Sequence, residues 1–306
     1  MRLALLRVQL IKFRGSKKPM QINDVVSIET LRDIALICLN NPPVNAASQA
    51  LRYGLQQAIS IANTNDSIRV VAIYGAGRTF VAGADIKEFD GPPLEPMLPE
   101  LVNEIEESET PVVVILHGTA LGGGLEIALG GHVRVGLKGL KVGLPEINLG
   151  LLPGAGGTQR TPRLIGIPAA LDMILSGRHI PANEALELGL IDRLSDEIPR
   201  DAAIGAAKDI LSGVLIPRRT GEILVKADHS YLDKMKATLA RTHAHLVSPH
   251  KCVEAVRASS LKLSEGLKLE KRAFAESMNT PQRAGLIHAF FGERAARNIP
   301  EAKMDP

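Results

Sequence analysis

Thirteen of the chain's 28 glycines fall between Gly118 and Gly157, and no other feature constrains the fold as strongly. Glycine has no side chain to pack, so a segment this rich in it brings backbone groups close to other backbone or to a ligand. Three glycines stand together at Gly122–Gly124, after an apolar run that predicts a strand over Val112–Leu116 and before a predicted helix. The pattern therefore predicts a strand, a glycine turn and a helix in this part of the chain.

Strands and helices alternate ahead of this segment. The apolar patterns predict a hairpin, a helix with Ser48 as its N-cap, a buried strand, and a Glu-rich helix that stops before Pro111. In order, these elements cover Val25–Glu29 and Ile34–Leu39 (the hairpin), a helix carrying Leu51, Leu55, Ile59 and Ala62, the strand Arg69–Tyr74, and the helix Glu100–Glu107. Such a succession indicates an α/β architecture with buried parallel strands.

The composition changes again near residue 200. From about Asp201 onward no strand is predicted, and prolines at positions 217, 249, 281 and 300 interrupt what read as helices alone. We therefore expect three segments: a basic leader over residues 1–19 that is disordered, a core over residues 20–200, and a C-terminal helical domain over residues 201–306.

The basic charge belongs to the leader. Six of the 36 basic residues and none of the 33 acidic ones lie within residues 1–18, so the remainder holds 30 basic against 33 acidic side chains, a net charge of −3. The leader is either an Arg-rich organelle presequence, which would place the protein in the mitochondrial matrix, or extra sequence ahead of a natural start at Met20. We expect the second, and with it a cytoplasmic protein. The widely separated Cys38 and Cys252 also fit a reducing compartment.

Several classes of protein fit this composition poorly. No apolar run approaches the roughly 18–20 residues of a membrane span, so no membrane association is expected. Aromatic residues make up only 3% of the chain and the core is not basic, which disfavours nucleic-acid binding. His243, His245, His250 and Cys252 lie in a polar helical segment without carboxylates, and we expect no metal site. Neither a phosphate-binding loop nor a dinucleotide fingerprint occurs.

Three segments carry groups suited to chemistry. Ala82-Gly83-Ala84 leaves backbone N–H groups uncovered, and the glycine triplet at a helix start offers further donors for developing negative charge. Glu126 falls in the first turn of that helix, where it would also simply complement the helix dipole. Glu146 lies among apolar residues, which would raise its pKa and suit a proton donor, although a hydrogen bond beside a loop would explain it too.

Four sequence motifs, taken in order along the chain, resemble those of the enoyl-CoA hydratase/isomerase (crotonase) superfamily. They are Asn41-Pro-Pro-Val-Asn-Ala46, Phe80-Val-Ala-Gly-Ala-Asp-Ile-Lys87, Ala120-Leu-Gly-Gly-Gly-Leu-Glu126, and Pro145-Glu146 with Pro153-Gly-Ala-Gly-Gly-Thr-Gln-Arg160. The tail over residues 286–294 is similar to the segment that follows the hydratase part of bifunctional fatty-acid oxidation proteins. The resemblance implies a spiral of β-β-α units with a C-terminal helical domain.

The resemblance also implies a site for an acyl-CoA thioester. Backbone N–H groups of Ala84 and Gly123 would form the oxyanion hole, Glu126 would activate water, and Glu146 would deliver a proton to C2. Coenzyme A is part of the substrate, so no separate cofactor is implied. The remaining implied substrate contacts are Val44, Ala46, Ala82, Asp85, Ile86, Lys87, Gly122, Pro145 and Gly154.

Two glutamates favour hydration, because an isomerase that only moves a proton can work with one. The expected activity is therefore that of an enoyl-CoA hydratase in fatty-acid β-oxidation. The alternatives are a Δ3-Δ2 enoyl-CoA isomerase, or a catalytically idle relic of a bifunctional protein that acts in assembly. The resemblance implies a homotrimer or a dimer of trimers, or a monomer if the C-terminal helices fold back over their own site.

Overall fold

The computed structural model describes residues 18–85, 88 and 91–296. The strands are β1 (Met20–Asn23), β2 (Val26–Leu31), β3 (Ile34–Leu39), β4 (Val70–Gly75), β5 (Val112–Leu116), β6 (Thr119–Leu121), β7 (Val133–Leu137), β8 (Lys141–Gly143), β9 (Ile180–Pro181) and β10 (Arg193–Ser195). The α-helices are α1 (Gln49–Asn63), α2 (Leu98–Glu107), α3 (Gly123–Gly130), α4 (Gly157–Ser176), α5 (Ala182–Glu187), α6 (Pro199–Leu211), α7 (His229–Thr242), α8 (Ser248–Arg257), α9 (Leu263–Met278) and α10 (Pro281–Ala296). Short 3-10 helices within the described ranges include η2 (Pro145–Leu149), η3 (Thr220–Glu222) and η4 (Ala258–Ser260).

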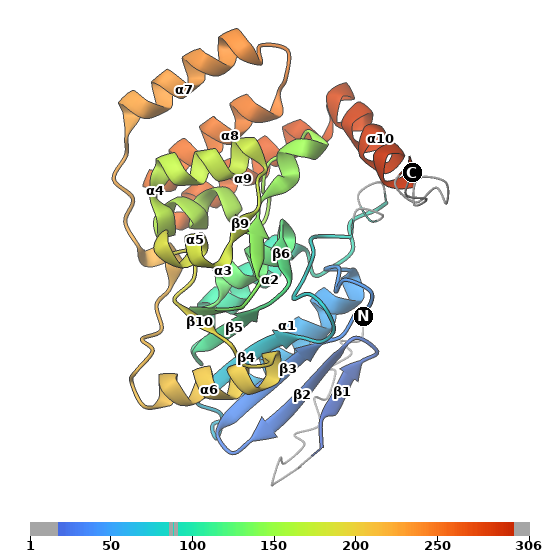
Figure 1. The fold of residues 1–306 in the computed structure, drawn as a ribbon, viewed down its shortest axis with the longest axis vertical. Coiled ribbons are helices and arrows are strands. Elements are labelled where there is room, and N and C mark those ends of the chain that lie inside the picture. Colours follow the sequence, from blue (N-terminus) through green and yellow to red (C-terminus); the bar gives the residue numbers. More distant parts are fainter. Residues whose placement is uncertain (1–17, 86–87, 89–90, 297–306) are drawn as a thin grey trace, which may run out of the picture.

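A seven-stranded sheet forms the lower half of the molecule in Figure 1. Its strand order is β1-β2-β3-β4-β5-β7-β10, antiparallel from β1 to β3 and parallel from β3 to β10. The predicted hairpin is present, with Leu31 opposite Ile34 at its turn. A second sheet of three short strands, β6-β8-β9, lies beside the first. The predicted α/β architecture with buried parallel strands is thus confirmed.

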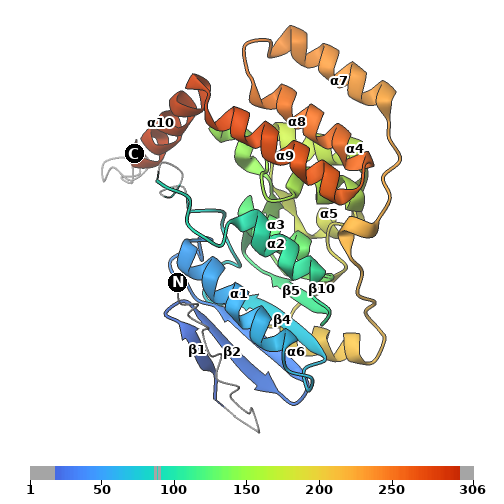
Figure 2. The same cartoon turned by 180° about the vertical axis from the view of Figure 1, so that it is seen from behind.

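The two faces of the large sheet are covered by different helices. Successive side chains of a strand point to opposite faces. In β3, Ile34 and Leu36 join the cluster that packs against α6, whereas Ala35 and Ile37 join the main core with α1, α2 and α3. Figures 1 and 2, which view opposite sides, show α6 over one face and α1 over the other. Helix α1 begins as predicted, because the Ser48 hydroxyl accepts a hydrogen bond from the Leu51 N–H.

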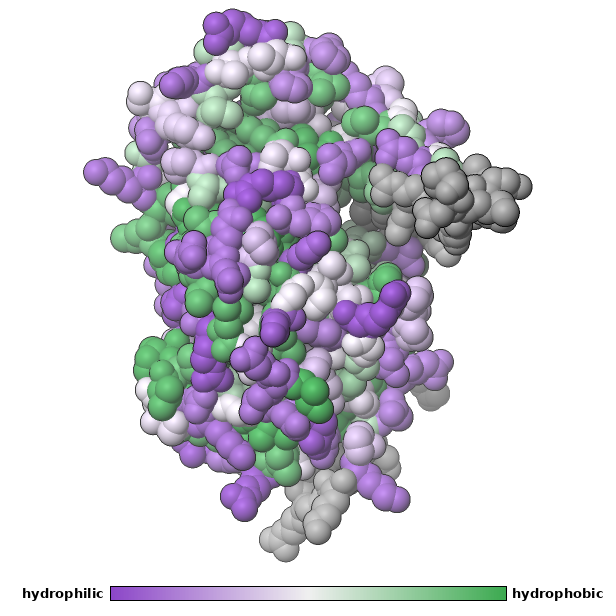
Figure 3. Space-filling view, in the orientation of Figure 1, coloured by the Kyte–Doolittle hydropathy of each residue, from purple (hydrophilic) through white to green (hydrophobic). Residues whose placement is uncertain are grey.

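The C-terminal helices gather around α4 at the other end of the molecule. Helices α8 and α9 both contact α4, and α7 lies outermost against α8. Within the described residues, no helix combines the length and the apolar character that crossing a bilayer requires. The face in Figure 3 mixes hydrophilic and apolar residues in small patches. The boundary near residue 200 stays a prediction, and α6, which follows it, packs on the sheet. The leader over residues 1–19 lies almost wholly outside the described residues.

Candidate active site

One cavity of about 1860 Å³ lies between the sheet core and the C-terminal helices. Both glutamates singled out from the sequence line it, together with both backbone positions expected to bind an oxyanion. Ile86 and Lys87 fall outside the described residues. The predicted site residues that line the cavity are Val44, Ala46, Ala82, Ala84, Asp85, Gly122, Gly123, Glu126, Pro145, Glu146 and Gly154. Positions separated by more than 100 residues in sequence therefore meet at one cavity.

The two expected oxyanion donors are neighbours. A Cβ atom built on Gly123 would lie 3.4 Å from the Ala84 nitrogen and 3.7 Å from its Cβ. Among the described residues, no hydrogen bond uses the N–H of Ala84 or of Gly123. Gly122 has a φ of +51°, a conformation that side-chain-bearing residues rarely adopt, and it turns the chain into α3 so that Gly123 begins the helix. The site thus offers two uncommitted backbone donors, Gly123 at the N-terminus of α3 and Ala84 beside it.

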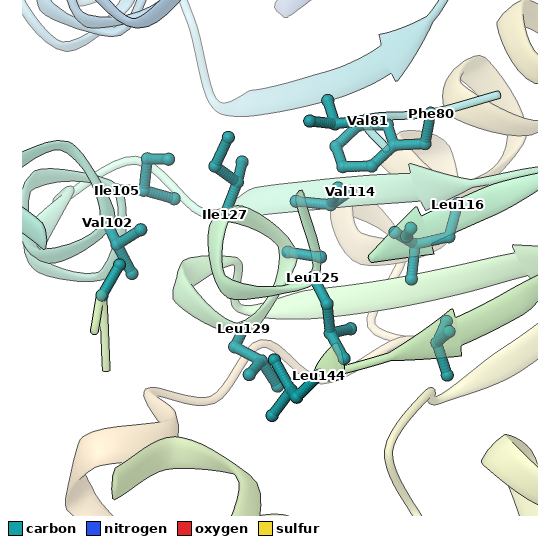
Figure 4. Packing of buried hydrophobic residues seen from close by; sticks show 14 of the residues in the cluster. Phe80, Val81, Val102, Ile105, Val114, Leu116, Leu125, Ile127, Leu129 and Leu144 are labelled. Carbon is teal, nitrogen blue, oxygen red and sulfur yellow. The ribbon is translucent and has the colours of Figure 1, made fainter. Parts of the chain in front are cut away.

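Helix α3 is buried along its whole length, which fixes the groups at its start. Figure 4 shows Leu125, Ile127 and Leu129 leaving the helix in different directions among apolar side chains of neighbouring elements. Gly124 allows the closest approach, because a Cβ there would lie 2.0 Å from the carbonyl oxygen of Val81. The strand-like segment around Val81 and the start of α3 are therefore in direct backbone contact.

Glu126 projects from the first turn of α3 and is only 3% exposed. Its Oε1 accepts hydrogen bonds from the N–H groups of Ala155 (2.7 Å) and Gly157 (2.9 Å). Burial raises the pKa of Glu126, while these two bonds and the charge of Arg160 act in the opposite direction. No hydrogen bond from the described residues reaches Oε2. One carboxylate oxygen is thus anchored and the other is left for a ligand or water.

Glu146 lies in η2, next to the glycine turn. A Cβ built on Gly122 would lie 3.0 Å from Glu146 Oε1, whereas Oε2 is buried and has no hydrogen-bond partner among the described residues. Burial raises the pKa of Glu146 well above its ordinary value, and the negative charges of Glu126 and Glu270 add to that rise. A carboxyl group in this environment is stabilised in its protonated form, as its apolar sequence context led us to expect.

The C-terminal helices of the same chain form the far wall of the cavity. Helix α9 contributes Phe274 and Met278, and α10 contributes Leu286 and Phe290. Lys268 and Lys271 on α9 also line the cavity. Helices of this chain therefore lie over its own cavity, as in the fold-back alternative, and the oligomeric state stays a prediction.

Sequence reasoning missed several buried charged residues near the cavity, among them Arg52 and Glu270. Arg52 on α1 donates to the carbonyl oxygens of Ala47, Leu94 and Pro96 and pairs with Glu88 at 2.7 Å, which holds the rim of the cavity. Glu270 on α9 is 1% exposed and lines the cavity as well. Both stand among polar residues in amphipathic helices, so the residues next to them in sequence do not mark them as buried.

The helix around Glu270 did contain one usable signal. Gly266 lies inside α9, where glycine is unfavourable by about 1 kcal/mol relative to alanine. A Cβ at Gly266 would lie 2.0 Å from Gln159 Oε1 of α4, so this glycine marks a close approach of the two helices. No group of three or more His, Cys, Asp or Glu residues suited to a metal ion is found in the part of the chain that the structure describes.

Comparison with known proteins agrees with this architecture. The family model for enoyl-CoA hydratase/isomerase matches residues 29–251. A peroxisomal bifunctional enzyme of Danio rerio is 40% identical over 268 residues, which cover 87% of this chain but only 37% of that protein. A probable enoyl-CoA hydratase of Bacillus subtilis is 33% identical over 282 residues, covering 89% of this chain and 97% of the relative.

Solved structures show the same fold. The crystal structure of an enoyl-CoA hydratase from Bacillus anthracis aligns with a TM-score of 0.56 at 29% identity, covering 88% of this chain and 96% of the other. This similarity confirms the crotonase-type α/β fold with a C-terminal helical region that the sequence predicts. Given the matched family model, the B. subtilis relative and the shared fold, the chain belongs to the enoyl-CoA hydratase/isomerase family.

Proposed function

We propose that this chain is an enoyl-CoA hydratase that adds water across the 2,3 double bond of an enoyl-CoA thioester. The observation that carries the proposal is the meeting of Glu126, Glu146 and two uncommitted backbone N–H groups at one cavity. The names of the relatives support it, since the B. subtilis protein is called a probable enoyl-CoA hydratase. The proposed reaction needs no separate cofactor, because coenzyme A is part of the substrate.

The thioester carbonyl is the group that the backbone donors suit. When water adds at C3, negative charge develops on this oxygen as an enolate-like oxyanion. The N–H groups of Ala84 and Gly123 would bind that oxygen, and each such donor is typically worth about 2.7–4 kcal/mol of barrier. The Gly123 donor lies at the buried start of α3 and Ala84 pairs with Ala47 in a parallel bridge, so both donors are in place before the reaction.

The two glutamates divide the acid and base work. Glu126, held through Oε1, would orient a water with Oε2 and take its proton as the water oxygen bonds to C3. Glu146, kept protonated by its buried environment, would give its proton to C2 as the double bond is lost. One proton enters Glu126 and one leaves Glu146, so the exchange of a proton with solvent restores both groups.

The apolar wall of the cavity would bind the acyl tail of the substrate. Phe274, Met278, Leu286 and Phe290 on α9 and α10 suit a hydrocarbon chain, whereas Lys268 and Lys271 suit the phosphates of coenzyme A.

The pathway that we propose for this activity is fatty-acid β-oxidation. A relative from Arabidopsis thaliana, 34% identical, is named a peroxisomal fatty acid beta-oxidation multifunctional protein. The cytoplasmic location and the trimeric association stay predictions.

The test is the loss of enoyl-thioester absorbance with crotonyl-CoA and with longer 2-enoyl-CoA substrates. Glu126→Gln and Glu146→Gln should each lower kcat by about 10²- to 10⁴-fold, while the control Glu187→Gln, an exposed carboxylate on α5, should leave it unchanged. A folded wild-type protein that leaves every substrate unaltered refutes hydration. Conversion of a 3-enoyl-CoA that survives Glu126→Gln would instead identify an isomerase. Calorimetry without saturable acyl-CoA binding would identify an idle module.

A further inference from the structure

Four consecutive backbone N–H groups at the start of α4 are shared between two carboxyl groups. Those of Ala155 and Gly157 bind Glu126 Oε1. Those of Gly156 (2.6 Å) and Thr158 (3.0 Å) bind the two oxygens of Glu270, and the Thr158 hydroxyl donates to Glu270 as well. Neighbouring amides along this turn thus point alternately toward the cavity carboxylate on α3 and toward α9.

Glu270 is an unusual residue for this position if it serves packing alone. It is fully buried beside another acid, and burial with the charge of Glu126 raises its pKa to about 8. The hydrogen bonds from Thr158 and Gly156 and the charge of Arg160 oppose that rise. An apolar side chain would avoid this cost but would leave two buried N–H groups unpaired. In its ionised form, which these hydrogen bonds and Arg160 favour, the Glu270 side chain offers the turn two acceptor oxygens and no donor.

The turn is held against the C-terminal helices by a connected set of contacts. Gln159 donates both to the Thr158 hydroxyl and to the carbonyl oxygen of Ala255 on α8. The carboxylate of Glu270 on α9 therefore acts within a network that reaches from α8 to the first turn of α4. A shift of α9 would move Gly156 and Thr158, and with them the two amides that hold Glu126.

We propose that Glu270 is a positioning residue that fixes the start of α4 so that Ala155 and Gly157 hold Glu126 in the orientation that activates water. The proposal rests on the proposed hydratase function. It assigns the C-terminal helical region a part in the chemistry, through α9, in addition to its part in lining the cavity.

The principal test is Glu270→Gln. This variant keeps the size of the side chain but turns an NH2 group toward one of the backbone N–H groups that now donate to Glu270. We expect kcat for crotonyl-CoA to fall about 10- to 100-fold, because small misplacements of a catalytic group have effects of this size. KM should change by less than about twofold, since Glu270 contributes no uniform substrate binding in this scheme.

A double variant separates positioning from a general structural effect. If Glu270 acts through Glu126, then adding Glu270→Gln to Glu126→Gln should lower kcat no further, because residues that act as a unit are not additive. Arg257→Gln is the matched control. Arg257 on α8 pairs with Asp233 on α7, and its described contacts do not include the turn, so this variant should leave kcat unchanged.

The outcomes distinguish this proposal from the function on which it rests. A wild-type protein that hydrates no enoyl-CoA overturns both. Two results would overturn the positioning role alone, given a wild-type protein that hydrates crotonyl-CoA. In the first, Glu270→Gln keeps the wild-type kcat. In the second, Glu270→Gln lowers kcat by the same factor whether or not Glu126 is present. Should Glu270→Gln fail to fold, Thr158→Val removes the hydroxyl bond to Glu270 and the bond from Gln159 but keeps the Thr158 N–H. This variant should lower kcat about tenfold, whereas an unchanged kcat again overturns the role.

Discussion

Gly124→Ala tests whether the close contact at the start of α3 governs the geometry of the site. The new Cβ would lie 2.0 Å from the Val81 carbonyl oxygen, and such contacts are essentially never shorter than 3.0 Å. The helix start must therefore move by about 1 Å, a displacement that typically lowers rates about 100-fold. Overpacking of this kind also costs about 1–3 kcal/mol of stability. The displaced helix carries both the Gly123 N–H and Glu126.

Steady-state hydration of crotonyl-CoA and urea denaturation measure the two effects separately. Gly205→Ala on α6 is the control, because its Cβ would meet only Glu197 Oε2 at an ordinary 3.4 Å. Alanine should favour that helix by up to about 1 kcal/mol and leave kcat unaltered. A Gly124→Ala protein with the kcat and the denaturation midpoint of the wild type would show that the backbone contact has no such role.

Three further predictions follow from buried charges and from a helix cap. The rate of hydration should fall at low pH, where Glu126 is protonated, and at high pH, where Glu146 loses its proton. A pH profile of kcat/KM that lacks the fall at high pH would contradict the assignment of Glu146. Arg160→Met should lower the free energy of unfolding measured in urea by about 3–5 kcal/mol, because the buried Glu106 would lose its ion pair with Arg160 at 2.7 Å. The additional change Glu106→Leu should restore much of that loss. Ser48→Ala should cost about 0.5–1 kcal/mol, the lower end for an N-cap, because the bond to Leu51 is long at 3.4 Å.

Local signals predicted the elements that depend on local interactions. The strands Ile34–Leu39 and Val112–Leu116 and the cap at Ser48 were predicted to the residue, since apolar runs and capping chemistry are written in adjacent positions. The strands of the small sheet were not predicted. β6, β8 and β9 have two or three residues each and exist only because distant segments pair.

The residues of the site also fall into those that local sequence predicts and those that depend on distant segments. Glu126 and Glu146 stand next to glycine turns and could be found from their neighbours in sequence. Glu270 and Arg52 acquire their roles from packing against segments far along the chain, and their own helices read as amphipathic surface helices. A single sequence therefore indicates the groups at the centre of the cavity better than the groups that hold them in place.

The strands at the two edges of the large sheet are its shortest. β1 has four residues and β10 has three, so within the described residues each edge presents few unpaired backbone groups to another chain. Such an edge is a poor template for strand addition by a second molecule. The short edge strands thereby limit the edge-to-edge growth of the large sheet that leads to aggregates.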